Sequence, residues 1–146
     1  MHTTPQVLEE TGHAPLAQAR LEALQVTRRL AVSTPTPEAL ARVEGEAARR
    51  GEELLSPADL SIVALALDLR AAGLAPTVVS DDYGVQNLSA ALGVTWRPIS
   101  TRGIASVWAW RIYCPGCGKV FRSTRRTECD VCGTRLRRKP EAKRPA

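Results

Sequence analysis

The sequence predicts an α/β protein in which helices flank a parallel sheet and a small cysteine-rich module follows at the C-terminal end. Two observations support this prediction. Up to residue 96, segments with apolar residues at helical spacing alternate with short apolar runs, and beyond residue 113 two Cys-x-x-Cys pairs occur. A chain of 146 residues has room for one domain of about 100 residues and one small module.

The N-terminal part is expected to hold two helices separated by a short strand. Apolar residues at helical spacing predict a long amphipathic helix that includes residues 16–26, and residues 30–33 have the composition of a strand. Thr36 is suited to cap the next helix and Pro37 to occupy its first position. This helix should run toward Gly51.

The middle of the chain repeats the same alternation. A Ser-Pro pair at residues 56–57 should open an apolar helix that ends at Gly73. Residues 76–80 are few, apolar and partly β-branched, which predicts a buried parallel strand. A further helix is expected over residues 83–92, and residues 94–97 should form another short strand.

Carboxylates occur at two places that such a fold brings to one edge of the sheet. Asp59 lies in the first turn of the apolar helix, and Asp81 and Asp82 directly follow the strand at residues 76–80. Neighbouring carboxylates repel one another and are held together by a hard cation, so the pattern indicates a divalent-metal site that acts on a phosphodiester. Asp68 is rotated to the opposite helix face and is expected to be solvated surface.

The same acids also fit purely structural roles. Ser56 and Asp59 match a capping box, in which the acid accepts a backbone N–H group at the helix start. Asp81 or Asp82 alone fits an N-cap. Convergence of both signals at one sheet edge favours the metal site, and the sequence leaves the structural alternative open.

Four cysteines define the C-terminal module. Cys114 and Cys117 form one pair and Cys129 and Cys132 the other, with eleven residues between the pairs. Four thiolates at this spacing are typical of a structural zinc site, whose closed tetrahedral shell leaves no position for substrate. Disulfides are the alternative, and the sequence shows no secretory signal that would favour them. The sequence therefore predicts a zinc ribbon that binds but does not cut.

Positive charge is concentrated in the C-terminal third. Residues 1–96 contain 7 Lys or Arg against 12 Asp or Glu, a net charge of −5, whereas residues 97–146 contain 13 against 3, a net charge of +10. This excess predicts a polyanionic partner, with a solvated tail as the alternative for the last residues. Trp108, Trp110 and Tyr113 are expected to pack the ribbon against the first domain, and base stacking is the alternative. The candidate RNA contacts are Arg111, Lys119, Arg122, Arg125 and Arg126.

Taken together, these motifs resemble those of one family. The Thr-Thr-Pro-x-Val-x-Glu-Glu stretch at residues 3–10, the Ser-x-x-Asp helix start, the Ser-Asp-Asp-Tyr-x-Val-Gln-Asn motif at residues 80–87 and the cysteine pairs are similar to the archaeal Nin-one-binding endoribonucleases, in which a PIN nuclease domain is joined to a zinc ribbon. The resemblance implies a Mg²⁺- or Mn²⁺-dependent endoribonuclease that trims the 3′ end of the small-subunit rRNA precursor in the pre-ribosomal particle.

The resemblance also assigns the acids of the site. It favours Glu10 over Glu9 as the inward acid and matches Asp59 and Asp82 to two further family acids, with Asp81 as their neighbour. Members of the family begin with an apolar strand that ends in an Asp and supplies the central strand, and no such segment precedes Thr3. The sequence leaves three alternatives open: a misassigned start, a truncation, or a version that has lost full metal coordination.

The expected organisation has four parts. They are an N-terminally incomplete PIN-like domain at residues 1–96, a linker at 97–107, the zinc ribbon at 108–138 and a basic disordered tail at 139–146. With no apolar run long enough for a membrane span, we expect a soluble, cytoplasmic protein. The alternatives are a non-catalytic RNA-binding ribosome-assembly factor and a toxin-type PIN ribonuclease, which the ribbon disfavours. The oligomeric state is left open.

Overall fold

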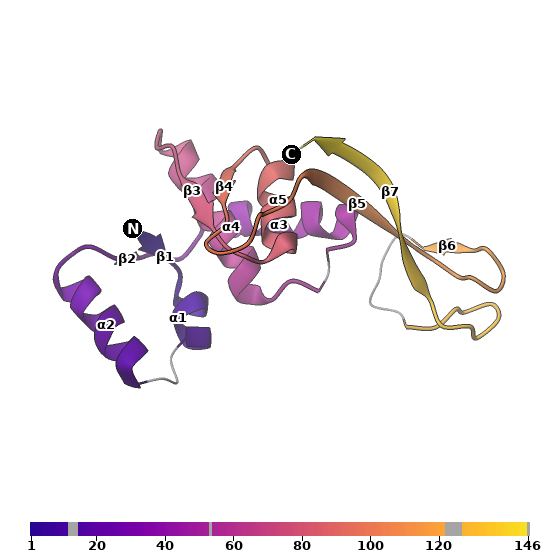
Figure 1. Ribbon diagram of the computed structural model, residues 1–146, viewed down its shortest axis with the longest axis horizontal. Coiled ribbons are helices and arrows are strands. Elements are labelled where there is room, and N and C mark those ends of the chain that lie inside the picture. The colour runs from indigo at the N-terminus through magenta and orange to yellow at the C-terminus, as the bar shows by residue number, and fades with distance from the viewer. Residues whose placement is uncertain (12–14, 53, 122–126, 146) are drawn as a thin grey trace.

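The computed structural model describes residues 1–11, 15–52, 54–121 and 127–145, the side chains of 142–145 excepted (Figure 1). It is a mixed α/β structure, which confirms the predicted fold class. None of the helices in the described part of the chain is both long and apolar enough to span a membrane. In chain order the elements are β1 (His2–Thr3), α1 (Pro5–Thr11), α2 (Pro15–Val26), β2 (Ala31–Val32), α3 (Pro37–Arg50), α4 (Pro57–Ala71), β3 (Thr77–Val79), α5 (Tyr83–Ala91), β4 (Thr95–Arg97), β5 (Ser106–Tyr113), β6 (Val120–Phe121) and β7 (Arg137–Pro145).

The ends of helix α3 follow the capping signals of the sequence. Thr36 is the N-cap, and its Oγ1 accepts a hydrogen bond from the backbone N–H of Ala39 at 3.2 Å. Gly51 ends the helix in the left-handed region, with φ of 67°. A Cβ at this glycine would lie 3.0 Å from the carbonyl oxygen of Trp110, so glycine also allows strand β5 to approach the helix end.

Asp68 has a structural partner, so its prediction as solvated surface was wrong. Its Oδ2 accepts a hydrogen bond from the Thr36 backbone N–H at 2.7 Å, and its Oδ1 one from the Thr36 hydroxyl at 2.8 Å. The side chain does face away from Asp59, but that face of α4 meets the start of α3. Asp68 therefore ties the two helices together.

The parallel strands form two separate pairs in the described part of the chain. β1 pairs with β2, and β3 with β4, both in parallel. Strand β3 is less buried than predicted, since Val78 is 4% exposed but Val79 is 58% exposed. The reason is that β3 has a strand neighbour on one side, while its other side borders a cavity.

That cavity separates the two parallel pairs. Its volume is about 540 Å³, and its walls come from β1, β3 and the apolar face of helix α4. Residues that line it are Met1, His2, Thr3, Val7, Ile62, Leu65, Ala66, Leu69, Leu74, Ala75, Pro76, Thr77, Val78 and Val79. The space is therefore bordered by one strand from each parallel pair.

The core is built where α3, α4 and α5 meet the β3–β4 pair. Val43, Val63 and Leu88 are fully buried in it, and Trp96 of β4 packs against its edge. Helix α2 contributes nothing to this core and has no buried residue, so the amphipathic character predicted for it was wrong. Figure 1 shows α2 to one side of the α3–α5 body.

The C-terminal module is an antiparallel sheet with the strand order β6-β5-β7. The prediction of a disordered tail at 139–146 was wrong up to Pro145, because β7 pairs with β5 along its whole length. Prolines argued for disorder, but β7 is an edge strand, where a missing N–H group is tolerated. Pro140 also lies beside a register shift opposite Ala109 and Trp110.

Candidate active site and metal centre

The four cysteine sulfurs gather into one cluster. All four Sγ atoms lie within 4.8 Å of one another, and none forms a disulfide. Cys114 Sγ is 3.3 Å from Cys132 Sγ, and Cys117 Sγ is 3.6 Å from Cys129 Sγ. Thiolates around a zinc ion at about 2.3 Å would be about 3.8 Å apart. The cluster therefore fits a tetrahedral metal ion, as the spacing of the cysteines predicts.

Both cysteine pairs adopt the same turn. In the first, the Cys114 N–H donates to the Lys119 carbonyl at 2.8 Å, and the Gly118 N–H donates to the Cys114 carbonyl at 2.9 Å. Gly118 has φ of 76°, a conformation that favours glycine. The second pair repeats these features with Cys129, Gly133 and Thr134. Two matched turns therefore supply two sulfurs each to the cluster.

The sulfurs differ in how readily they ionise. Hydrogen bonding to Thr134 lowers the pKa of Cys132 to about 6. The pKa of Cys117 rises to about 12. The hydrogen bond from the Lys119 backbone N–H lowers this pKa, but desolvation and the neighbouring thiols together raise it by more. Four thiolates at this distance repel one another, so a bound cation is what would allow all of them to ionise.

Asp59 forms the capping box that the sequence left open as its structural role. Its backbone N–H donates to Ser56 Oγ at 3.2 Å, and its Oδ2 accepts from the Ser56 backbone N–H at 3.0 Å. Oδ2 also lies 3.0 Å from Ser56 Oγ. The capping bonds all use Oδ2, so Oδ1 is the oxygen that the capping box leaves for a further ligand.

Asp82 is the N-cap of helix α5. Its Oδ1 accepts hydrogen bonds from the backbone N–H groups of Gly84 at 2.7 Å and Val85 at 3.0 Å, and the side chain is exposed. A Cβ on Gly84 would lie 2.9 Å from Leu55 Cδ2 and 3.0 Å from Asp82 Oδ1, so a larger residue there would require these side chains to shift. As with Asp59, one carboxylate oxygen serves the helix.

Asp81 holds the segment that follows β4. Its oxygens accept backbone hydrogen bonds from Ile99 at 2.9 Å, Ser100 at 3.0 Å and Thr101 at 3.1 Å, and hydroxyl bonds from Ser100 at 2.6 Å and Thr101 at 3.0 Å. The Ser100 hydroxyl and these N–H groups hold the pKa of Asp81 well below its usual range. Both oxygens are engaged, which makes Asp81 an anchor beside Asp82.

Replacing Asp81 with Asn should expose the amides of Ile99, Ser100 and Thr101 to solvent exchange. Asn has one acceptor oxygen and no charge, so it can replace only part of this set of bonds. The folded-state pKa of Asp81 is lowered, so its stabilising contribution is present above the ordinary Asp pKa and is lost as pH falls through the folded value. Hydrogen exchange measured near neutral pH tests this. Asp82→Asn should leave the same three amides protected, and equal protection in the Asp81 variant would contradict the anchoring role.

Glu10 lies in the last turn of α1 and is exposed. Its helix is held against α4 by a buried hydrogen bond of 2.7 Å between Thr4 Oγ1 and Ser61 Oγ, close to Asp59 along α4. In the described residues, Glu10, Asp59 and Asp82 do not gather closely enough to hold a metal ion as the cysteines do.

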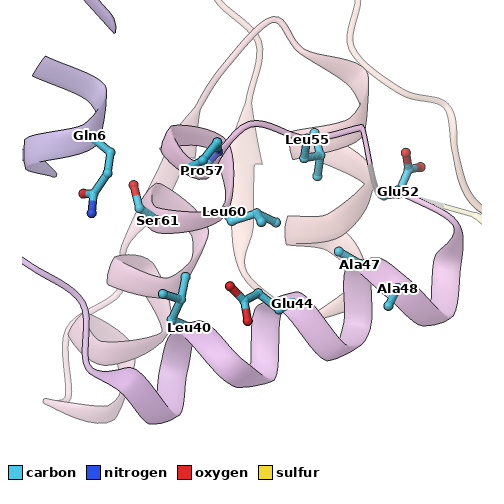
Figure 2. A pocket seen from close by; sticks show the side chains of 10 residues that line it. All are labelled: Gln6, Leu40, Glu44, Ala47, Ala48, Glu52, Leu55, Pro57, Leu60 and Ser61. Carbon is cyan, nitrogen blue, oxygen red and sulfur yellow. The ribbon is translucent and has the colours of Figure 1, made fainter. Parts of the chain in front are cut away.

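Figure 2 shows a different cavity, of about 560 Å³, bounded by α1, α3 and α4. Apolar side chains such as Leu40 and Leu60 line it, together with the carboxylates of Glu44 and Glu52. The Oε1 atom of Gln6 is buried there and has no hydrogen-bond partner among the described residues. None of the predicted acids lines this cavity, although Pro57 and Leu60, which do, are neighbours of Asp59 on α4.

Two amide side chains of α5 join the two modules, a role that the sequence patterns did not predict. Gln86 donates to the Ser80 carbonyl at 2.8 Å and accepts from the Ile104 N–H at 2.9 Å. Asn87 accepts from the Trp108 N–H at 2.6 Å and donates to the Trp108 carbonyl at 2.8 Å. Both are buried, and two amides inside an otherwise apolar helix were the signal that could have revealed them.

Two of the five candidate RNA contacts already have partners within the ribbon. Arg111 forms an ion pair with Glu141, and Lys119 forms one with Asp130 at 2.8 Å. Arg122, Arg125 and Arg126 lie outside the described residues. Other exposed cations of the ribbon are Arg135, Arg137, Arg138 and Lys139.

The chain is similar to known ribonucleases. Residues 1–69 match the family described as the PIN domain of ribonuclease. Endoribonuclease Nob1 of Pyrococcus abyssi is 37% identical over 145 residues, which cover 98% of this chain and 86% of that protein. Endoribonuclease Nob1 of Methanothermobacter thermautotrophicus is 37% identical over 113 residues, covering 76% of this chain and 66% of that protein.

A second group of relatives carries another name. Ribonuclease VapC3 of Aeropyrum pernix is 46% identical over 102 residues, which cover 69% of this chain and 73% of that protein. The match to the Pyrococcus protein extends over nearly the whole chain, whereas this one covers a shorter part of it. The longer match therefore takes in both the α/β domain and the cysteine module.

Proposed function

This chain belongs to the Nob1 family of PIN-domain endoribonucleases, and we propose that it is a metal-dependent endoribonuclease that matures the 3′ end of small-subunit ribosomal RNA. The observation that carries this proposal is the 37% identity over 98% of the chain to a protein named endoribonuclease Nob1. The substrate would be the rRNA precursor in a cytoplasmic pre-ribosomal particle. The experiment that tests it is cleavage of such a precursor RNA in the presence of Mn²⁺ by a longer chain that adds a strand ending in Asp.

In this proposal Glu10, Asp59 and Asp82 are the catalytic acids. A divalent cation, Mg²⁺ or Mn²⁺, would supply charge stabilisation at the attacked phosphodiester. Asp59 and Asp82 each use one oxygen for a helix cap, which fixes the carboxylate and leaves the second oxygen for this role. Asp81 supports the site by holding the segment at residues 99–101.

The acid set is proposed to be completed by a strand that occupies the cavity between β1 and β3. Each of these strands pairs on one side, in parallel, with β2 or β4. A strand inserted between them would join the two pairs into one parallel sheet and cover the exposed Val79. An Asp at the end of that strand would lie at the carboxyl edge of the sheet, where Asp82 lies.

The ribbon is proposed to hold one structural Zn²⁺ and to bind RNA through its cations. We expect Arg135→Glu combined with Arg137→Glu to weaken binding of single-stranded RNA and to reduce the salt slope of the affinity by about 1 for each phosphate that is no longer neutralised. Fluorescence anisotropy at several salt concentrations measures both. Arg42→Glu, an exposed site on α3, is the control. An unchanged salt slope in the double variant would place the RNA contacts elsewhere.

A non-catalytic RNA-binding assembly factor is the second candidate. It is favoured by one observation: the three proposed catalytic acids do not form a metal-binding group in the described residues. Under this alternative the protein binds the precursor RNA without cutting it, even when the strand between β1 and β3 is supplied.

A further inference from the structure

A cavity of about 550 Å³ lies at the junction of the two modules. One wall is the start of α5, another is the segment that leads into β5, and the third is the antiparallel β5–β7 strand pair. The residues that line it are Glu52, Tyr83, Gly84, Asn87, Gly103, Ile104, Ala105, Ser106, Trp108, Trp110 and Arg138.

Aromatic rings and opposite charges share this cavity. The rings of Trp108 and Trp110 are stacked, with centroids 5.9 Å apart and planes at 25°. The Arg138 guanidinium lies 4.9 Å from the Trp110 ring centroid and 3.6 Å from Glu52 Oε2. At the rim, Tyr83 is 56% exposed. The cavity thus offers flat apolar surfaces together with a donor and an acceptor.

Contacts behind the walls hold the cavity in shape. Asn87 bonds to both backbone groups of Trp108 and donates to Glu52 Oε1 at 2.8 Å. Gly103 has φ of 70°, and a Cβ there would lie 2.7 Å from the Trp96 ring, so only glycine allows this turn. The rings and charged groups are therefore positioned by the fold before any ligand binds.

The position of the cavity relates it to the proposed catalytic site. Tyr83, at its rim, directly follows Asp82 in the first turn of α5. Gly84 lines the cavity and donates its N–H to Asp82 Oδ1. A ligand that fills the cavity would thus lie beside the carboxylate at which the phosphodiester is proposed to be cut.

We propose that this cavity binds one unstacked nucleobase of the RNA, next to the phosphodiester held at Asp82. The inference rests on the proposed ribonuclease function and adds a base-binding site to it. Bases stack on aromatic side chains, and their edges exchange hydrogen bonds with carboxylate and guanidinium groups such as those of Glu52 and Arg138. The net charge of +10 on residues 97–146 favours a nucleic acid over a neutral ligand.

An apolar side chain of a protein partner would fit this cavity less well. It would bury the charges of Glu52 and Arg138 without offering them any hydrogen-bond partner. A base has a flat ring that can stack on the aromatic side chains and polar edge atoms that can hydrogen-bond to Glu52 and Arg138.

The test uses a five-nucleotide single-stranded RNA with 2-aminopurine at its centre, titrated with the full chain without added Mg²⁺ or Mn²⁺. We expect Tyr83→Ala to weaken binding about tenfold, since loss of a stacked aromatic costs about 1–3 kcal/mol per base. Tyr83→Phe keeps the ring and should bind like the unchanged protein. With an abasic residue at the centre of the RNA, the Ala variant and the unchanged protein should bind equally.

Two results would overturn the base site: equal binding of the 2-aminopurine RNA by Tyr83→Ala and the unchanged protein, or the same loss of affinity with the abasic RNA. Cleavage is measured separately, with Mn²⁺ and the rRNA precursor, in a longer chain that adds a strand ending in Asp between β1 and β3. If Tyr83 contributes to base binding but no cleavage is seen, the base site stands and the proposed ribonuclease function is wrong. If the RNA is cut but intact and abasic RNA bind equally well, the proposed function stands and the base site is wrong.

Discussion

Replacing Cys117 with Ser should abolish zinc binding and unfold the two cysteine turns while the α/β domain stays folded. The chain is expected to carry about one zinc ion, since its four sulfurs lie within 4.8 Å of one another. Small metal modules take most of their folding free energy from the ion, at about 10–16 kcal/mol for zinc-finger peptides. Ser offers no thiolate, and three remaining ligands bind the ion far more weakly.

The first half of β5 should survive this loss. Val107 is 2% exposed where β5 meets the α/β domain, and Trp108 is bonded through both backbone groups to Asn87. Elemental analysis measures the zinc, and hydrogen exchange separates the residues near Cys114 from those near Trp108. Val131→Ser is the matched control, because Val131 is 64% exposed in the second turn and is not a ligand. Folded protein without metal, or four reactive thiols in the native state, would contradict the structural zinc site.

Local signals in the sequence predicted the helix ends correctly. The Thr36 cap, the start at Pro57 and the stop at Gly51 each depend on residues within one turn of the helix end. Features that depend on a distant partner were missed. Asp68 meets Thr36 from another helix, and β7 is held in place by β5, so neither could be inferred from composition nearby.

In the candidate site, too, the features set by local sequence were predicted and those that depend on distant partners were not. The cysteine cluster followed from spacing alone, because each turn is local and its chemistry is specific. Asp59 and Asp82 could be located but not given a single role, since a helix cap and a metal ligand call for the same residue type at the same position. Gln86 and Asn87 belong to a motif that the sequence shows, but their partners at Ile104 and Trp108 become neighbours only in the fold.

In a longer chain that adds a strand ending in Asp, Asp59→Asn and Asp82→Asn should each abolish Mn²⁺-dependent cleavage of the small-subunit rRNA 3′ precursor and leave RNA binding nearly intact. Asn is as good an N-cap as Asp, so the change at position 82 removes charge while keeping the bonds to Gly84 and Val85. Cleavage is followed on denaturing gels, and binding by anisotropy. The chain of 146 residues should cut weakly or not at all. A longer chain that adds a strand ending in Asp should cut well, because four carboxylates hold a hard cation more completely than three.

The control for Asp59 is Ser56→Ala. It removes a hydroxyl of the same capping box, which costs about 1 kcal/mol of stability, and leaves the carboxylate in place. Asp68→Asn is not neutral, since it disturbs the bonds to Thr36. If Ser56→Ala and Asp59→Asn lose similar stability but only the second loses cleavage in the longer chain, the carboxylate acts in catalysis. If both variants melt at a lower temperature and cut as well as the unchanged longer chain, Asp59 serves the helix alone and the catalytic acids lie elsewhere.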